Sequence, residues 1–156
     1  MSQNLILRQN DEIMDSIEAA MIANLPQVDC PVAHLFTPNL YVREIFMAKD
    51  TLITSKIHKS SHPFTISKGK VAVSIDGGKW EVLEAPYTSI TLPGTRRLLY
   101  IIEDCVWSTY HSMSGISGDE NYFNDEDKIN VVAKIEEEIM DPYENSLLTN
   151  SINYIT

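Results

Sequence analysis

The sequence predicts a mainly β domain, a sandwich or small barrel with a helix on either side of it in the chain. Between residues 30 and 112, about eight short strand-like segments alternate with turn signals, at the 8–12-residue spacing typical of sandwiches and barrels. Apolar residues near the N-terminus recur at every fourth position instead, which indicates a helix. The chain has 156 residues, of which 44% are hydrophobic, so it can form one domain with a core.

Residues 1–29 are predicted to form an N-terminal helical extension, with the helix running from Asp11 to Asn24. Asn10 suits the N-cap position, and Pro26 ends the helix because proline cannot continue it. The apolar positions form one stripe of Ile13, Ile17, Met21 and Leu25, with Met14 and Ala20 beside them. Such a stripe packs either on its own domain or on another chain.

Residues 30–113 are predicted to form the barrel. The clearest turn is the sequence Asp76-Gly77-Gly78, because both glycines accept the positive φ that a tight hairpin requires. Further breaks are expected at Lys68-Gly69 and at Glu103-Asp104. These turns divide the region into eight expected strands, at 41–48, 51–58, 62–67, 70–75, 79–83, 89–92, 97–102 and 105–111.

Residues 114–156 are predicted to form an acidic C-terminal helix and tail. The glycine- and serine-rich segment 114–118 indicates a linker, and apolar periodicity indicates a helix over 126–140. From residue 119 onward there are ten acidic residues and two lysines, so most of the chain's net charge of −10 lies here. The tail is rich in apolar residues and is expected to pack on the barrel, on a neighbouring subunit or on another protein.

Composition excludes several functions. A net charge of −10 argues against binding to the phosphate backbone of nucleic acids, and no apolar run approaches the ~20 residues that span a bilayer. The first residues do not have the pattern of a secretory signal, so we expect the cytoplasm of a host cell, or a virion, as the location. Cys30 and Cys105 are expected to be buried reduced thiols.

Three histidines are the candidate metal ligands. His58 and His62 are four residues apart in a strand-like region, and His111 lies near the end of the same region. Residues i and i+4 of a strand share a face, so His58 and His62 could reach one point. Neutral imidazoles suit Zn²⁺, Fe²⁺, Ni²⁺ or Cu²⁺. The alternative is a set of hydrogen-bonded histidines in a metal-free barrel.

Arg96 and Arg97 follow the Pro93-Gly94 turn and could together clamp a carboxylate or phosphate at the barrel mouth. The alternative is pairing with local acids such as Glu103 and Asp104. We expect Trp107 in the core, Trp80 partly exposed, and His34 in a structural or solvent-facing position. The chain contains no Ser–His–Asp set at recognisable spacing and no phosphate-binding glycine loop, so hydrolytic and phosphoryl-transfer chemistry have no support.

Residues 38–112 resemble the cupin superfamily, which has a double-stranded β-helix or jelly-roll fold. Gly69 matches the glycine that closes the first cupin motif, His62 takes the place of its glutamate, and His58 takes the second histidine position. Lys56 stands where the first histidine would be. The second motif survives as the run from Pro93 to Arg97, where Arg97 or Leu98 replaces its histidine.

Three parts of the sequence are also similar to small bacteriophage-encoded cupin-like proteins: 58–62, 85–87 followed by 93–95, and 103–111. This resemblance implies a small cupin-type jelly-roll barrel in a phage-associated protein, and it does not imply an enzyme. The first hypothesis is therefore a non-catalytic structural or accessory virion protein. It would form a homo-oligomer and contact virion proteins through its helices and apolar tail.

Two alternatives remain open at this point. One is a metal-dependent cupin enzyme of dioxygenase or isomerase type, with His58, His62 and His111 as ligands and Arg97 orienting an anionic substrate or cofactor. The other is a cupin that binds a small molecule without chemistry.

Overall fold

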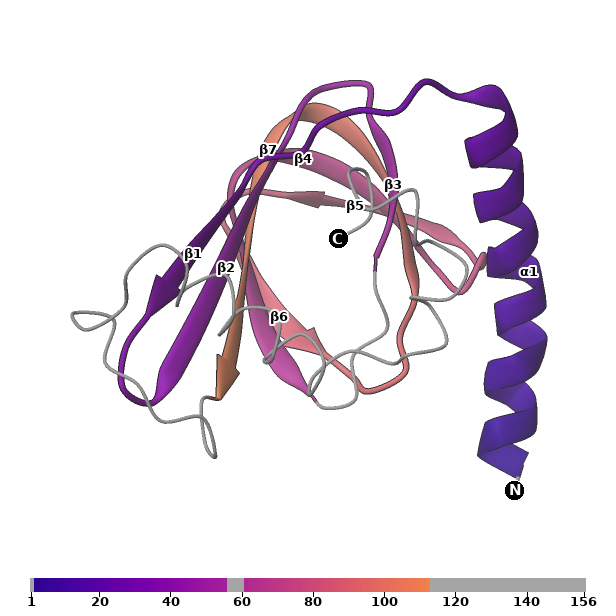
Figure 1. The fold of residues 1–156 in the computed structure, drawn as a ribbon, viewed down its shortest axis with the longest axis horizontal. Coiled ribbons are helices and arrows are strands. Elements are labelled where there is room, and N and C mark those ends of the chain that lie inside the picture. The colour runs from indigo at the N-terminus through magenta and orange to yellow at the C-terminus, as the bar shows by residue number, and fades with distance from the viewer. Residues whose placement is uncertain (1, 56–60, 113–156) are drawn as a thin grey trace.

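The computed structural model describes residues 2–55 and 61–112, which form one helix and seven strands (Figure 1). This confirms the predicted mainly β class. The elements are α1 (Ser2–Asn24), β1 (Val32–Phe36), β2 (Leu40–Met47), β3 (Leu52–Thr54), β4 (His62–Ile75), β5 (Trp80–Glu84), β6 (Tyr87–Thr91) and β7 (Arg97–Ser112). The predicted C-terminal helix and apolar tail lie outside the described residues, and so does His58.

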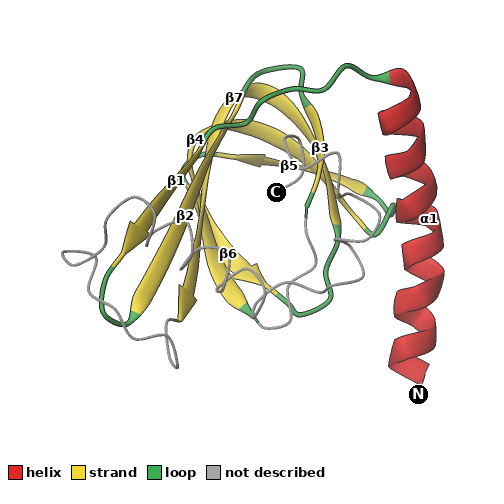
Figure 2. Ribbon diagram, viewed as in Figure 1, coloured by secondary structure: helices red, strands yellow, loops and turns green. Residues whose placement is uncertain are grey.

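All seven strands belong to one antiparallel sheet that curls into a barrel, while α1 stands outside it (Figure 2). The main path is β1-β2-β7-β4-β5, with β3 also paired to β7 and β6 also paired to β4. The long strands β4 and β7 pair with each other, and each also pairs with two shorter strands at different parts of its length. The C-terminal half of β7 pairs with β2, whereas its N-terminal half pairs with β3.

The expected breaks at Lys68-Gly69 and Glu103-Asp104 are wrong, because β4 and β7 run through both positions. The strands instead absorb these residues as shifts of register between Ile66 and Val71. Gly69 has a φ of 95°, which glycine adopts without strain. These residue types usually form turns. Here the antiparallel pairing of two long strands keeps the chain extended, and the extra residues form a bulge instead of ending the strand.

The barrel core is built from side chains that alternate inward along each strand. Together with the half-buried side chains packed against it, the buried hydrophobic cluster includes residues from every strand. Trp107 lies in this cluster, as predicted, and Trp80 is 47% exposed. Cys30 and Cys105 are buried and free, as expected. Burial raises the pKa of both thiols to about 11, with Asp29 adding to the effect at Cys30, so both stay protonated and unreactive near neutral pH.

Helix α1 begins at Ser2, well before the predicted start, and its buried face matches the predicted stripe only in part: Met21 is buried and Ile17 half-buried, but Leu25 is exposed. Met14 and Met21 are buried with Leu98, whereas Ile13 is 51% exposed. Glu18 lies between the two methionines on the same buried face. The reason lies in the tertiary structure: Arg96, which lies just before β7, faces this side of the helix and forms an ion pair with Glu18. Among the described residues, no helix is long and apolar enough to span a membrane.

Candidate functional site

Two of the three predicted metal ligands meet inside one end of the barrel. His62 begins β4 and His111 lies one residue before the end of β7, and both side chains are buried. Their ring centroids are 4.7 Å apart. The two histidines are brought together by the pairing of β4 with β7, which places Phe64 opposite Thr109. The third predicted ligand, His58, lies outside the described residues.

His111 is held as a neutral imidazole. Burial is the largest cause that lowers its pKa to about 3, and the neighbouring His62 and Arg43 contribute in the same direction. Its Nε2 lies 2.9 Å from the hydroxyl of Thr109, and its ring stacks on Tyr41 at a centroid distance of 5.8 Å. A neutral histidine can accept or donate a hydrogen bond, or bind a metal.

Sequence reasoning missed the rings that extend this site across β2 and β1. Tyr41 is fully buried beside His111, and its hydroxyl lies 2.6 Å from Nδ1 of His34. Phe36 stacks on the other side of Tyr41 at 5.1 Å. Alternation within the predicted strand 41–48 could have identified Tyr41 as inward-facing. No sequence signal identified β1, so His34 could not be placed.

The described residues by themselves do not make a metal centre. Within residues 2–55 and 61–112, no group of three His, Cys, Asp or Glu side chains is arranged to hold a metal ion. His62 and His111 provide two nitrogen ligands at most, and one nitrogen of His111 faces Thr109. A site that also uses His58 stays a prediction, which elemental analysis of the untagged protein would test.

Arg96 and Arg97 do not form a paired clamp, because Arg96, just before β7, binds acidic residues of α1 while Arg97, the first residue of β7, binds Thr91. Arg96 points outward to α1, where its guanidinium lies 2.9 Å from Asp15 and 2.9 Å from Glu18. The expected alternative pairing with Glu103 or Asp104 is therefore wrong for Arg96. Its acidic partners come from the helix, which the sequence did not place against this strand.

Arg97 points into the barrel and is only 8% exposed. Its guanidinium carbon lies 5.1 Å from the ring centroid of Phe64 and 5.9 Å from that of Trp107, and its Nη1 donates a hydrogen bond to Thr91 at 3.0 Å. Burial lowers the pKa of Arg97, but a guanidinium stays protonated in proteins. The side chain is thus a buried cation on an aromatic surface.

A cavity of about 240 Å³ opens beside this cation. Arg97 shares its lining with aromatic, apolar and polar side chains from β4, β5 and β6. They are Phe64, Val73, Ile75, Lys79, Glu81, Leu83, Tyr87, Ser89 and Ile90. Among the described residues, Arg97 forms no ion pair, although Glu81 lies on the same cavity. Tyr87 and Asp76 act on Arg97 through space and raise its pKa against the effect of burial. The cavity therefore combines aromatic walls with a cation that has no direct ion-pair partner among the described residues.

The buried neutral state of His111 predicts a loss of stability in acid. Its pKa in the folded state is about 3, below the value of 6.5 expected when the chain is unfolded. The unfolded state therefore binds a proton more readily between these values, and stability falls as the pH falls below 6.5. Lowering the pH from 7.5 to 5 should remove about 2 kcal/mol through this residue.

Urea denaturation of the protein and of His111→Gln at both pH values measures this effect. The variant should lose less stability over the same interval, because glutamine does not titrate. An equal pH dependence in both proteins would contradict the assignment of a neutral His111.

No family model matches this chain, and no curated protein sequence does. Solved structures do resemble it. An uncharacterised conserved protein with a double-stranded β-helix domain from Klebsiella pneumoniae is 16% identical, over 60% of this chain and 84% of that one, with a TM-score of 0.48. A cupin superfamily protein from Desulfitobacterium hafniense is 6% identical, over 57% and 82% of the two chains, with a TM-score of 0.46.

The cupin domain of Cnp3 from Schizosaccharomyces pombe is 16% identical, over 56% of this chain and 70% of that one, with a TM-score of 0.45. All three are cupin or double-stranded β-helix proteins, the type of fold that the sequence resemblance implied. The likeness of this chain to phage proteins stays a prediction. At these identities, the activity of this chain has to be argued from its own residues.

Proposed function

We propose that the barrel is a non-catalytic binding module for a small anionic molecule, with Arg97 as the group that holds the anion. The single observation that carries this proposal is a buried guanidinium that lines a cavity and forms no ion pair among the described residues. An unpaired buried charge is costly to the fold. A bound carboxylate or phosphate would compensate it with two parallel hydrogen bonds.

The walls of the cavity favour a planar ligand body. Phe64 and Tyr87 line it, and Trp107 lies behind Arg97. A volume of about 240 Å³ suits a small molecule. An aromatic carboxylate such as benzoate matches both features, since its carboxylate faces the guanidinium and its ring contacts the aromatic walls.

Benzoate is therefore expected to bind to the full-length protein and to bind at least tenfold more weakly to Arg97→Met. Isothermal titration calorimetry measures both affinities. Lys68→Met removes a cation from an exposed position of β4 outside the cavity and should bind benzoate as the natural protein does. Equal binding to Arg97→Met, or no binding to the natural protein, would contradict the proposal.

The stability of Arg97→Met provides a second readout. If the guanidinium is kept for a ligand, methionine should leave the free energy of unfolding unchanged or raise it, since a buried charge is replaced by an apolar side chain of similar length. If its contacts with Phe64 and Trp107 serve the fold, methionine should destabilise the protein.

Two other functions predicted from the sequence remain proposals. A metal-dependent cupin enzyme is favoured by the adjacent rings of His62 and His111 and by the lowered pKa of His111, and it requires His58 as well. A structural or accessory role in a virion rests on the phage-like segments and on residues 114–156. For that role, the buried face of α1 is already used by the barrel, which leaves the C-terminal segment as the main candidate contact.

A further inference from the structure

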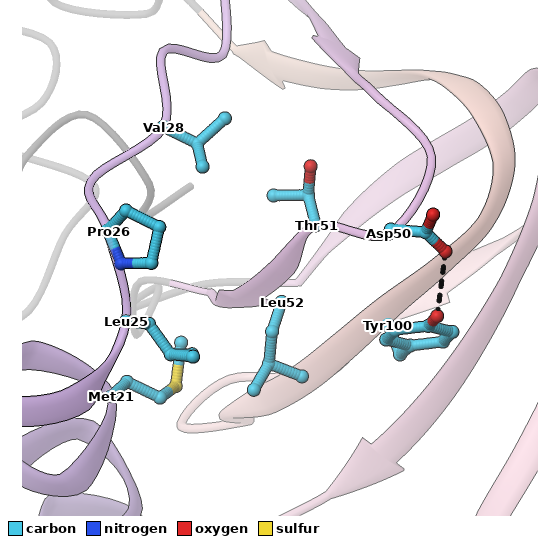
Figure 3. A pocket seen from close by; sticks show the side chains of 8 residues that line it. All are labelled: Met21, Leu25, Pro26, Val28, Asp50, Thr51, Leu52 and Tyr100. Carbon is cyan, nitrogen blue, oxygen red and sulfur yellow. Dashed lines mark hydrogen bonds between the residues drawn. The ribbon is translucent and has the colours of Figure 1, made fainter.

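A second concave site lies outside the barrel, where the end of α1 and the segment after it meet strands β3 and β7 (Figure 3). Its volume is about 280 Å³. One wall consists of side chains from the helix end and its connection to β1, and the other of residues 50–52 with Tyr100. The lining residues are Met21, Leu25, Pro26, Val28, Asp50, Thr51, Leu52 and Tyr100. We call this site the helix groove.

The helix groove is apolar except for three neighbouring polar groups at one side. Asp50 accepts a hydrogen bond from the Tyr100 hydroxyl at 2.8 Å (Figure 3). This bond uses Oδ1 of Asp50, and Oδ2 has no hydrogen-bond partner among the described residues. The carboxylate raises the pKa of Tyr100 through that bond and through its charge, so the phenol stays a donor and holds the carboxylate in place.

Thr51 adds a second hydrogen-bonding group to the polar side of the groove. The residue is only 5% exposed and lines the groove. Its backbone amide and carbonyl are both hydrogen-bonded, to Ala48 and Ile101. Its hydroxyl makes no hydrogen bond to any described residue. The hydroxyl oxygen itself is not enclosed, since it is not among the buried side-chain atoms that lack a partner. It is therefore accessible at the groove and can accept a hydrogen bond from a ligand.

The chemistry of these groups selects the ligand. A carboxylate only accepts hydrogen bonds, and a threonine hydroxyl can accept one as well. An ammonium group has three donors and one positive charge, so it can serve Asp50, Thr51 and water at once. The remaining surface of the groove is apolar and suits a hydrocarbon body. The chain's net charge of −10 also favours a cation over an anion.

We propose that the helix groove binds a small apolar amine, with its ammonium group on Asp50 and Thr51 and its hydrocarbon body against Met21, Leu25 and Leu52. This site is separate from the cavity at Arg97, and it selects the opposite charge. It is also built from two parts of the fold, because α1 supplies one wall and the barrel the other. Binding there would therefore hold the helix on the barrel.

The test uses n-hexylammonium as the probe on the full-length protein, with hexanoate and hexanol as probes of equal chain length. Amide chemical shifts in ¹H–¹⁵N spectra report both affinity and location up to about 10 mM, the range in which so small a ligand is expected to bind. Hexylammonium should bind saturably, with the largest shifts at residues 21–28, 50–52 and 100. Hexanoate should not bind in the groove.

Two variants distinguish a charge-selective site from an apolar surface. Asp50→Asn should weaken hexylammonium binding at least tenfold; asparagine also tolerates the φ of 68° at this position, so the backbone is preserved. Thr51→Val should weaken binding by a smaller factor without changing the charge. Glu84→Gln removes a carboxylate from the exposed face of β5, outside the groove, and should bind normally.

Three results would overturn the proposal. They are equal binding of hexylammonium and hexanol, unchanged affinity in both Asp50→Asn and Thr51→Val, and no shifts at the groove residues at the highest concentration. If Asp50→Asn does not fold, Thr51→Val and the comparison of the three probes decide the question. Arg97→Met should leave hexylammonium binding intact, so failure of the anion site and failure of this site are distinguishable.

Discussion

Arg96→Met is expected to destabilise the protein by about 3–5 kcal/mol or to release α1 from the barrel, because it leaves a carboxylate buried without its cation. Arg96 is 1% exposed, and Glu18 beside it is buried as well. The guanidinium lies 2.9 Å from both Glu18 and Asp15. Removing one member of a buried ion pair costs more than removing both, since the remaining charge keeps its desolvation penalty.

The double variant Arg96→Met/Glu18→Met should therefore recover most of the lost stability, because it replaces the pair with apolar side chains beside Met14 and Met21. Urea denaturation measures the free energy of unfolding, and limited proteolysis within residues 25–31 reports whether the helix is released. A loss below about 1 kcal/mol in Arg96→Met, typical of a surface ion pair, would contradict this account. So would a double variant that is no more stable than the single one.

Gly69→Ala is expected to cost about 3 kcal/mol or more, as its backbone φ of 95° is strained for any residue with a Cβ. A Cβ at this position would also lie 2.8 Å from the Asp104 carbonyl carbon and 2.8 Å from Cys105 Cα, and closer still to the Asp104 oxygen. These are backbone atoms of β7 and cannot move aside without disturbing the pairing of β4 with β7, the longest in the sheet.

Gly78→Ala is the matched control. The nearest atom to a Cβ at Gly78 is the Ile75 carbonyl oxygen at 3.1 Å, and its φ lies outside the positive range. We expect a change of about 1 kcal/mol for this variant, because only one backbone oxygen is close and a shift of a few tenths of an ångström relieves the contact. Thermal and urea unfolding of both variants measures the difference. Similar stability of the two would show that the bulge tolerates a side chain.

Local patterns in the sequence were sufficient for the class of fold and for much of the core. Turn residues and strand-like segments predicted a β domain after an N-terminal helix, and the structure has both. The hairpin at 76–78, the burial of Trp107 and the reduced cysteines were also predictable. Each of these depends on residues close together in the chain, where turn chemistry and apolar periodicity act directly.

The sequence did not show which strands pair with each other or which distant side chains meet. Breaks were expected inside β4 and β7 because glycine and charged dipeptides usually mark turns, yet strand pairing over the full length of both segments kept them continuous. His62 and His111 are 49 positions apart (111 − 62), and they meet only through that pairing. The start of the strand at residue 97 was predicted correctly, but the docking of α1 that draws Arg96 to Asp15 and Glu18 was not, so the opposite directions of Arg96 and Arg97 were missed.

The sequence by itself determined that this chain is a mainly β domain with an N-terminal helix, a filled core and histidines and arginines able to form sites. Only the tertiary structure decided which of them meet. It turned the Met14–Glu18–Met21 face of α1 toward Arg96, left Arg97 beside an internal cavity, and formed the helix groove from two distant segments. The physical reason is that a side chain's partner depends on strand register and helix docking, which follow from the packing of the whole chain.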